Sequence, residues 1–308
     1  MKISIIGAGA MGSIYGGLLA QSGNKVTLID TWTAHIDGIN KRGLKIDGPN
    51  GLQTIKNVFA SNNINNAASS DLIIIATKAS KVEEVAEQIS TFISKNSVVL
   101  TIQNGLGSAE KVAKFIGREQ ILLGVADGFG ASVMKPGHIH HNAMKLIRIG
   151  SLKKSGNKKA LKICRLWENA GFKVKTFSDI ERLVWEKFIC NVTFSAPCTV
   201  FNCRIGELMD SRELWEIALG CMREAYDIGQ KRKISFSFDN PETYVSEFGE
   251  KMPMAKPSML LDHDNGQRSE IDFINGMVVT LGIDMGIKTP YNQTLCAIIS
   301  SREASFKS

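Results

Sequence analysis

Apolar residues in the first half of the chain form short unbroken runs, and segments with a helical period separate these runs. We predict strands over residues 2–6, 25–29, 71–76 and 97–102. Runs such as DLIIIA and SVVLTI lack polar alternation, which is typical of strands buried on both faces of a parallel sheet. Helical patterns over residues 11–21 and 81–93 separate strands, so a doubly wound α/β domain is expected.

The pattern changes twice further along the chain. Residues 124–150 are rich in glycine and predict further strands and loops, before a helix over 157–170 and a strand over 173–177. From about residue 178 the chain is strongly helical, with long patterns over 179–195, 211–231 and 270–281. The predicted fold class is α/β: an N-terminal Rossmann-type doubly wound parallel sheet (1–178) and a C-terminal all-helical domain (179–308).

Composition agrees with two globular domains. Hydrophobic residues make up 44% and charged residues 22% of the 308 residues, close to ordinary globular usage. The formal charge of +7 comes from scattered basic residues. No reader motif accompanies them, so we expect no nucleic-acid partner; the charge can instead attract an anionic substrate and cofactor.

The chain carries no signal for secretion, a membrane or a metal. Its N-terminal apolar run is too short for a signal peptide, no stretch reaches the roughly 20 apolar residues of a membrane span, and the six cysteines form no CxxC pair. We predict a cytoplasmic protein that does not bind membranes. A homodimer is the expected assembly, although no residue pattern predicts it.

Three histidines in GHIHHN suggest a metal site at first sight. His138 and His140 would share one face of a strand, with His141 on the other. No acid or cysteine in the neighbouring sequence completes a ligand set. We therefore favour an edge strand of polar residues and predict no metal.

A glycine-rich motif follows the first predicted strand and begins a helix. Its residues are Gly7, Ala8, Gly9, Ala10, Met11 and Gly12, which match GxGxxG. Gly7 permits a tight turn, Gly9 lets a pyrophosphate approach the backbone, and Gly12 allows close helix–strand packing. The helix N-terminus presents N–H groups to the anion. The alternative is a glycine-rich turn without a ligand, which the flanking strand and helix disfavour.

Asp30 bears on the choice of dinucleotide. It lies about 20 residues after the glycine motif, where an acid accepts hydrogen bonds from a ribose 2′-hydroxyl and repels a 2′-phosphate. This position favours NAD. The alternative is a solvated acid that ends the strand or caps a helix. Lys78, just after the strand over 71–76, favours NADP because it could face the adenosine phosphate.

Polar residues recur along the helix predicted over 179–195. Lys187, Asn191 and Ser195 are four residues apart and share one face. The neighbouring positions are apolar. On spacing alone, a lysine here is better explained as a surface residue that extends its amine into water than as a functional group.

Further motifs follow along the chain: Gln103-Asn104-Gly105, Ser258-Met259-Leu260, Glu270 within SEIDFINGM, and Thr289-Pro290-Tyr291-Asn292. Together with GxGxxG at 7–12 and the helix with Lys187 and Asn191, these segments resemble the ketopantoate reductase (2-dehydropantoate 2-reductase) family. They run from residue 3 to about 295, in the family's order and with family-like spacing.

The resemblance implies roles for individual residues. Lys187 matches the family's proton donor, and Glu270 matches its catalytic-site carboxylate. Asn104, Asn191 and Ser258 match polar residues that bind substrate, and Asn104 is also placed beside the cofactor. Lys78 matches a residue that contacts the 2′-phosphate of NADP(H). The implied reaction is hydride transfer to the ketone of ketopantoate, where an ammonium group both stabilises the developing oxyanion and donates a proton.

Three departures from the family pattern leave alternatives open. The stretch Asp127-Gly128-Phe129-Gly130 replaces a more polar family segment near the site. Ser195 stands where the family commonly has a second asparagine, and we take it as a substrate-binding residue. Asp30 stands at a corner where known members carry arginine, so NAD(H) remains an alternative to NADP(H). A related NAD-dependent dehydrogenase of another 2-oxo or 2-hydroxy acid fits these departures.

A non-catalytic dinucleotide sensor is a third interpretation. It is disfavoured because a sensor needs neither Lys187 nor Glu270. For an enzyme, we expect the small-molecule site in the cleft between the domains, with Asn104 contributed by the first and Lys187, Ser258 and Glu270 by the second.

Overall fold

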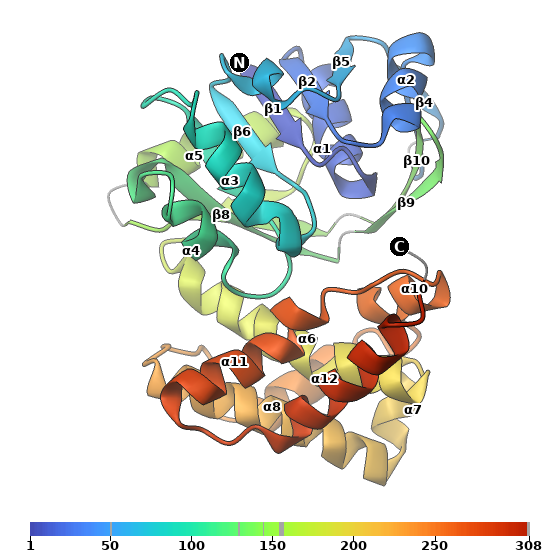
Figure 1. Ribbon diagram of the computed structural model, residues 1–308, viewed down its shortest axis with the longest axis vertical. Coiled ribbons are helices and arrows are strands. Elements are labelled where there is room, and N and C mark those ends of the chain that lie inside the picture. Colours follow the sequence, from blue (N-terminus) through green and yellow to red (C-terminus); the bar gives the residue numbers. More distant parts are fainter. Residues whose placement is uncertain (50, 129, 144, 154–156, 307–308) are drawn as a thin grey trace. The chain divides into compact units, whose positions relative to one another are not determined.

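The computed structural model describes residues 1–49, 51–128, 130–143, 145–153 and 157–306. These residues form two compact units (Figure 1), which are described separately below. Unit 1 comprises Met1–Gln103 and Gly107–Ile180, and unit 2 comprises Asn104–Leu106 and the chain from Glu181 onward. Among the described helices, none combines the length and apolar character that a membrane crossing requires.

An eight-stranded sheet forms the centre of unit 1. Its spatial order is β12-β11-β8-β7-β6-β1-β2-β5. The strands are β1 (Lys2–Ile6), β2 (Lys25–Ile29), β5 (Val58–Ser61), β6 (Leu72–Ile75), β7 (Val98–Thr101), β8 (Ile121–Asp127), β11 (Leu146–Ser151) and β12 (Val174–Thr176). All neighbours pair in parallel except β8 and β11. The predicted Rossmann-type sheet is confirmed, with an antiparallel extension at one end.

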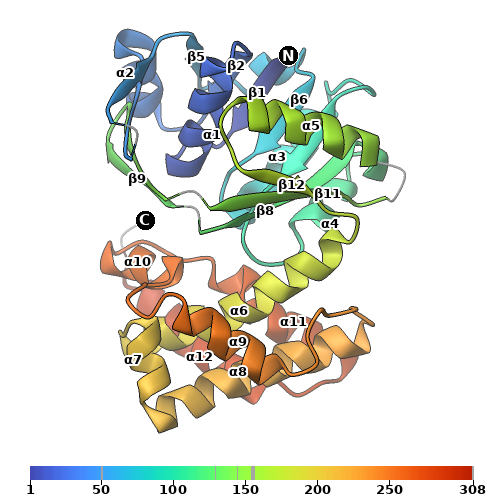
Figure 2. The same ribbon diagram turned by 180° about the vertical axis from the view of Figure 1, so that it is seen from behind.

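Helices cover both faces of this sheet. The helices of unit 1 are α1 (Ala10–Gln21), α2 (Thr33–Arg42), α3 (Val82–Ser90), α4 (Ser108–Ala113) and α5 (Asn157–Asn169), with 3₁₀ turns at Ile64–Ala67, Ala79–Lys81 and Arg118–Gln120. One apolar cluster joins α1 and α5 to one face, and a second joins α3 and α4 to the other. Figure 1 shows α3 on the near side, and Figure 2, seen from behind, shows α5 on the near side.

A smaller sheet packs against the other side of α1. Its order is β4-β3-β10-β9, with β3 (Leu44–Asp47), β4 (Gln53–Ile55), β9 (Gly130–Lys135) and β10 (His138–Ala143). Because β10 pairs with β3 on one side and β9 on the other, the prediction of an edge strand for the histidines is wrong. The acid that the sequence did not reveal is Asp47, with one oxygen 2.9 Å from His140 Nδ1 and the other 3.5 Å from His138 Nε2.

Every regular element in the described part of the chain from Glu181 onward is helical. The helices from this point of the chain are α6 (Ile180–Phe201), α7 (Ile205–Asp210), α8 (Arg212–Lys231), α9 (Pro241–Glu250), α10 (Ser258–Asp264), α11 (Asn275–Met285) and α12 (Pro290–Glu303), with a 3₁₀ turn η5 (Ile271–Phe273). Helix α6 is apolar on nearly all sides, as expected of a buried helix, and its side chains form much of the unit's core.

Two helix predictions in this region need correction. The helix predicted to end at Ser195 continues through Pro197 to Phe201. The helix predicted over 270–281 begins only at Asn275, because Ile274 adopts φ −111°, ψ −98° and interrupts the helical backbone. Glu270 therefore lies in the segment before η5 rather than on a helix.

Candidate functional site

The glycine motif forms a tight turn between β1 and α1. Gly7 has φ +97°, and an added Cβ would lie 2.5 Å from the backbone nitrogen of Thr77. At Gly12 an added Cβ would lie 1.9 Å from the Gly7 carbonyl oxygen, so strand and helix approach too closely for any side chain. At Gly9, by contrast, an added Cβ would meet no described atom within 4 Å. The turn is thus closed on its protein side and open above Gly9, as an anion cradle requires.

This turn lies where open α/β sheets bind dinucleotides. The chain passes from β1 outward to β2 and β5, then returns to β6 on the other side of β1. Ligands bind outside the carboxyl ends of the strands at such a switch point. The turn at residues 7–12, Asp30 and Lys78 follow the carboxyl ends of β1, β2 and β6 respectively.

Asp30 has one partner in the described structure that bears on its role. Its Oδ1 accepts a hydrogen bond of 3.0 Å from the backbone N–H of Trp32, at the start of α2. This bond closes a local turn ahead of α2 and does not cap the helix, whose N-cap Trp32 has no side-chain cap bond. A carboxylate still has acceptor capacity after one such bond, so the ribose role is not displaced. Lys78 is exposed, at the residue before the 3₁₀ turn that follows β6.

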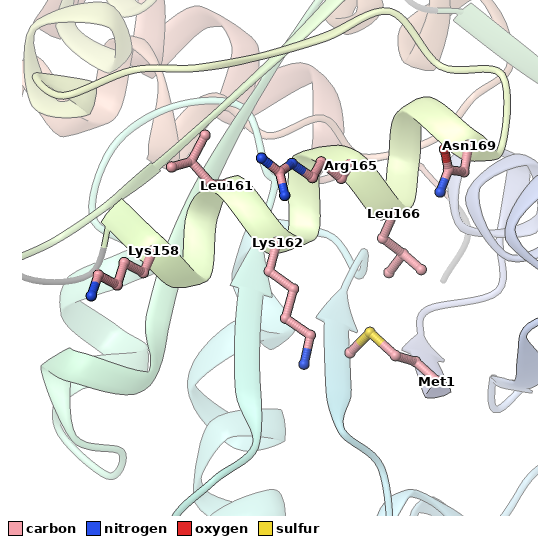
Figure 3. A pocket seen from close by; sticks show the side chains of 7 residues that line it. All are labelled: Met1, Lys158, Leu161, Lys162, Arg165, Leu166 and Asn169. Atoms are coloured by element: carbon pink, nitrogen blue, oxygen red, sulfur yellow. The ribbon is translucent and has the colours of Figure 1, made fainter.

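A surface hollow of about 450 Å³ on α5 is unsuited to the dinucleotide. It is lined by Met1 and α5 residues that include Lys158, Lys162 and Arg165. Figure 3 shows Leu166 of α5 extending toward Met1. Because Met1 precedes β1, the hollow lies at the amino ends of the strands, opposite to the glycine turn.

Helix α6 presents the three polar residues that its spacing predicts on one face. Lys187 and Asn191 are half-buried, and Ser195 is only 4% exposed. The side chains around them are core residues of unit 2. Lys187 is therefore on a mostly buried helix with partial access to solvent, rather than on an exposed surface.

The Asn104 turn packs against the segment that follows Glu270. Gly105 has φ +81°, and its α-carbon is so close to Phe273 that an added Cβ would lie 2.1 Å from the Phe273 carbonyl oxygen. The same oxygen accepts the Leu106 N–H at 3.2 Å. Contacts group Asn104–Leu106 with unit 2. By these contacts Asn104 is grouped with the other proposed substrate residues, whereas the sequence led us to expect it in the sheet-bearing domain.

A buried asparagine joins this segment to α6. Asn275 donates from Nδ2 to the Val192 carbonyl oxygen at 2.9 Å and to Asn292 Oδ1 at 2.8 Å. Asn292 in turn donates to Glu224 at 2.6 Å. Burial raises the pKa of Glu224, although bonds from Asn292 and Tyr291 oppose this effect. The carbonyl that Asn275 binds is next to Asn191, so the segments of Asn191 and Glu270 are held together.

Ser258 is linked to the same region through α10. It is the exposed first residue of that helix. Near the other end of α10, His263 Nε2 lies 3.0 Å from Glu303 Oε1, and this oxygen also accepts Ser269 N–H at 2.8 Å and Ser269 Oγ–H at 2.6 Å. Burial acts to raise the pKa of Glu303, but these bonds outweigh it and lower that pKa. Ser269 immediately precedes Glu270.

The predicted residues thus fall into two sets. The glycine turn, Asp30 and Lys78 are in unit 1; Asn104, Lys187, Asn191, Ser195, Ser258 and Glu270 are in unit 2. Within the described residues, no group of three or more His, Cys, Asp or Glu side chains is arranged to hold a metal ion.

Sequence reasoning did not identify Asn275 and Glu303 as groups that connect these segments. The only signal for Asn275 was an amide within an otherwise apolar pattern, and Glu303 is a polar residue close to the C-terminus. Their partners are 83 and 34 residues away, so only the folded chain reveals them.

Comparisons with known proteins cover almost the whole chain. The family models "Ketopantoate reductase PanE/ApbA" and "Ketopantoate reductase PanE/ApbA C terminal" match residues 3–154 and 179–303. A relative from Pyrococcus horikoshii named 2-dehydropantoate 2-reductase is 32% identical over 304 residues, which cover 99% of this chain and 98% of the relative. A relative of the same name from Streptococcus pyogenes serotype M3 is 29% identical over 305 residues, with the same coverage.

Solved structures give the same result and add a second named activity. A PanE/ApbA family ketopantoate reductase from Ralstonia eutropha JMP134 superposes with a TM-score of 0.91 at 25% identity and covers 100% of both chains. D-mandelate dehydrogenase in a ternary structure with NADH and anilino(oxo)acetate superposes with a TM-score of 0.90 at 28% identity and covers 99% of both chains.

Proposed function

Because the chain belongs to the ketopantoate reductase family, a family of oxidoreductases, we propose that it reduces ketopantoate to pantoate with a nicotinamide dinucleotide. One observation carries this proposal. The Asn275 side chain joins the helix of Lys187 and Asn191 to the segment of Glu270, so the residues that match the family's substrate and catalytic positions lie on segments held together.

Unit 1 fits the dinucleotide. The space above Gly9 and the N-terminus of α1 suit a pyrophosphate. When bound, the reduced nicotinamide supplies the hydride, and the protein supplies position and field. The remaining tasks fall to side chains of this chain.

Lys187 is proposed as the proton donor. Hydride addition to a ketone carbon places negative charge on its oxygen, and an ammonium group stabilises that charge and donates the proton that completes the alcohol. Its half-buried place on α6 supports this role, because electrostatic stabilisation is stronger where water is partly excluded.

The other residues of unit 2 are proposed to hold the substrate. Asn104, Asn191 and Ser258 can donate hydrogen bonds to carboxylate and hydroxyl oxygens without adding charge. Ser195 is nearly fully buried, so we assign it a contact at the inner end of the α6 row. Glu270 is proposed to orient the substrate hydroxyl, since a carboxylate near Lys187 would oppose any lowering of the lysine pKa.

A second candidate is an NADH-dependent reductase of a different 2-oxo acid. Asp30 favours NADH because its carboxylate repels a 2′-phosphate, and Ser195 replaces an amide at the substrate face. D-mandelate dehydrogenase, which is similar over the whole chain, has been solved with NADH. Lys78 and the family resemblance favour NADPH instead.

Steady-state oxidation of NADH and NADPH by the purified protein separates these candidates. Ketopantoate and benzoylformate, the oxo form of mandelate, are each supplied with either cofactor. The proposal expects ketopantoate to give the higher kcat/KM. A preference for benzoylformate with NADH would establish the second candidate, and turnover of neither acid would refute the ketopantoate assignment.

We also propose a cytoplasmic location and a homodimer. All six cysteines are unpaired, and burial raises the pKa of Cys164 and of Cys190 to about 12, so these thiols stay protonated and unreactive at neutral pH. Reduced cysteines are typical of cytosolic proteins. Analytical ultracentrifugation tests the assembly: a single species of monomer mass at micromolar concentration would contradict the dimer.

A further inference from the structure

A buried histidine lies at the centre of a hydrogen-bond chain that ends in the glycine turn. His35 of α2 is 0% exposed. Its Nδ1 is 3.1 Å from the backbone nitrogen of Gly137, in the turn between β9 and β10, and its Nε2 is 3.2 Å from Ser13 Oγ. Ser13 Oγ is 2.8 Å from the Ala8 carbonyl oxygen. The chain thus connects the small sheet, α2, α1 and the turn after β1.

The donors and acceptors along this chain are determined by its two ends. A backbone N–H can only donate, so Nδ1 of His35 accepts from Gly137 and carries no proton. The proton of the neutral ring is therefore on Nε2, which donates to Ser13 Oγ. The Ser13 hydroxyl then donates to the Ala8 carbonyl, which can only accept. Burial lowers the pKa of His35, opposed by the Asp30 carboxylate, and this lowering favours the neutral ring that the arrangement requires.

The Ala8 carbonyl controls the peptide on which anion binding depends. In a planar trans peptide the C=O and the following N–H point in opposite directions. Ser13 holds the Ala8 oxygen toward the protein, so the Gly9 N–H of the same peptide points the other way. An added Cβ at Gly9 would meet no described atom within 4 Å, so a ligand has room to approach this peptide. Ser13 thereby keeps one N–H directed toward the position of a pyrophosphate.

The other face of His35 supports the corner that contains Asp30. The imidazole stacks on the Trp32 ring, with 4.9 Å between centroids and 17° between planes. Trp32 is 41% exposed, and its backbone N–H donates a hydrogen bond to the Asp30 carboxylate. One buried ring therefore contacts both segments that flank the adenosine half of a Rossmann dinucleotide.

We propose that His35 and Ser13 are positioning residues that preorganise unit 1 for the ADP half of the cofactor. His35 sets the orientation of Ser13 and supports Trp32, and Ser13 sets the orientation of the Ala8–Gly9 peptide. The inference rests on the dinucleotide binding in the proposed function, but not on the identity of the oxo acid.

Calorimetric binding of ADP-ribose tests this proposal without any turnover. ADP-ribose contains the adenosine and the pyrophosphate but no nicotinamide. Ser13→Ala should weaken its binding by roughly tenfold to a hundredfold, as expected for losing one aligned hydrogen bond to an anion. The matched control is Ser4→Ala in β1. Ser4 is also fully buried and hydrogen-bonded, to Ser70 at 2.8 Å, but it does not touch the turn.

Two conservative histidine variants test the direction of the chain. The amide of His35→Asn can replace Nδ1 and accept from Gly137, but it does not reach Ser13. The longer amide of His35→Gln can replace Nε2 and donate to Ser13. His35→Gln should therefore bind ADP-ribose more tightly than His35→Asn, and His35→Asn should match Ser13→Ala.

The results separate the inference from the proposed function. Equal weakening by Ser13→Ala and Ser4→Ala, or wild-type affinity in Ser13→Ala, would overturn the inference. The same holds if the two histidine variants bind equally well, or if the wild-type protein binds no ADP-ribose. Wild-type binding of ADP-ribose without reduction of ketopantoate would refute only the proposed substrate, and the variant comparison would still stand.

Discussion

Replacing Gly105 with alanine should damage the substrate region through one steric contact. Gly105 has φ +81°, and the new Cβ would lie 2.1 Å from the Phe273 carbonyl oxygen. Gly171, in the turn after α5, is a matched control. It has φ +87°, and its added Cβ would meet no atom of the described chain within 4 Å. The two variants share the backbone strain and differ in the contact.

The structure gives the size of each effect. Alanine at a left-handed φ costs about 1–2 kcal/mol at either position. At Gly105 the turn must also retreat by roughly 1.3 Å to reach an ordinary contact of 3.4 Å. That movement breaks the bond from Leu106 N–H to Phe273, worth about 0.5–1.5 kcal/mol. We expect Gly105→Ala to lose roughly 1.5–3.5 kcal/mol of unfolding free energy and Gly171→Ala about 1–2 kcal/mol.

Kinetics distinguish a local effect from general destabilisation. A displacement of this size next to reacting groups can reduce turnover by about a hundredfold. With the oxo acid varied at saturating cofactor, Gly105→Ala should lose kcat/KM by about that factor, while Gly171→Ala keeps wild-type kinetics at temperatures where both are folded. Wild-type kcat/KM in folded Gly105→Ala would refute the assignment of the Asn104 turn to the substrate site.

Three further predictions concern the cofactor and stability. Asp30→Ser should raise the ratio of kcat/KM with NADPH to kcat/KM with NADH by roughly tenfold, because a charge that repels the 2′-phosphate is removed. An unchanged ratio would show that Asp30 does not determine the cofactor preference. Gly7→Ala should abolish ADP-ribose binding in calorimetry, because its Cβ would lie 2.5 Å from the Thr77 nitrogen. The control Gly23→Ala has φ +88° and no described atom within 4 Å of its Cβ, so it should retain binding. Equal affinities of the two variants would contradict the assignment of the glycine turn to the pyrophosphate. The folded pKa of Glu303 is lowered from 4.5, so its stabilisation is present above pH 4.5 and lost as pH falls through the folded pKa. As the pH is lowered through this range, the free energy of unfolding measured with urea should fall more steeply for wild type than for Glu303→Gln. The same pH dependence in both proteins would contradict this account.

The parts of the fold that sequence could predict are those that local patterns determine. Strands β1 and β2 begin and end where they were predicted, because a strand buried on both faces of a parallel sheet is mostly apolar. The glycine motif was recognisable because Gly7 and Gly12 lie where the protein leaves no room for a side chain, while Gly9 borders open space. The small sheet was not predicted: its strands β3 and β10 pair residues more than 90 positions apart, and short mixed strands have no pattern of their own.

The sequence identified candidate site residues, but not how the segments that carry them are arranged. Apolar residues recur from Ile271 to Val278 on both sides of Ile274, so periodicity alone could not reveal that Ile274 interrupts the helix. Similarly, a proline usually ends a helix, yet α6 passes Pro197 because its other residues are buried in the core. The grouping of Asn104 with unit 2 depends on Phe273, a contact that no local pattern predicts.

The Lys187→Ala variant tests the central claim most directly. This claim is that Lys187 on α6 donates the proton when ketopantoate is reduced. Turnover of ketopantoate at saturating cofactor is measured beside cofactor affinity by calorimetry. The account predicts that kcat falls by about 10²–10⁴-fold while the cofactor dissociation constant stays within about twofold of wild type. Wild-type turnover in Lys187→Ala would contradict the account.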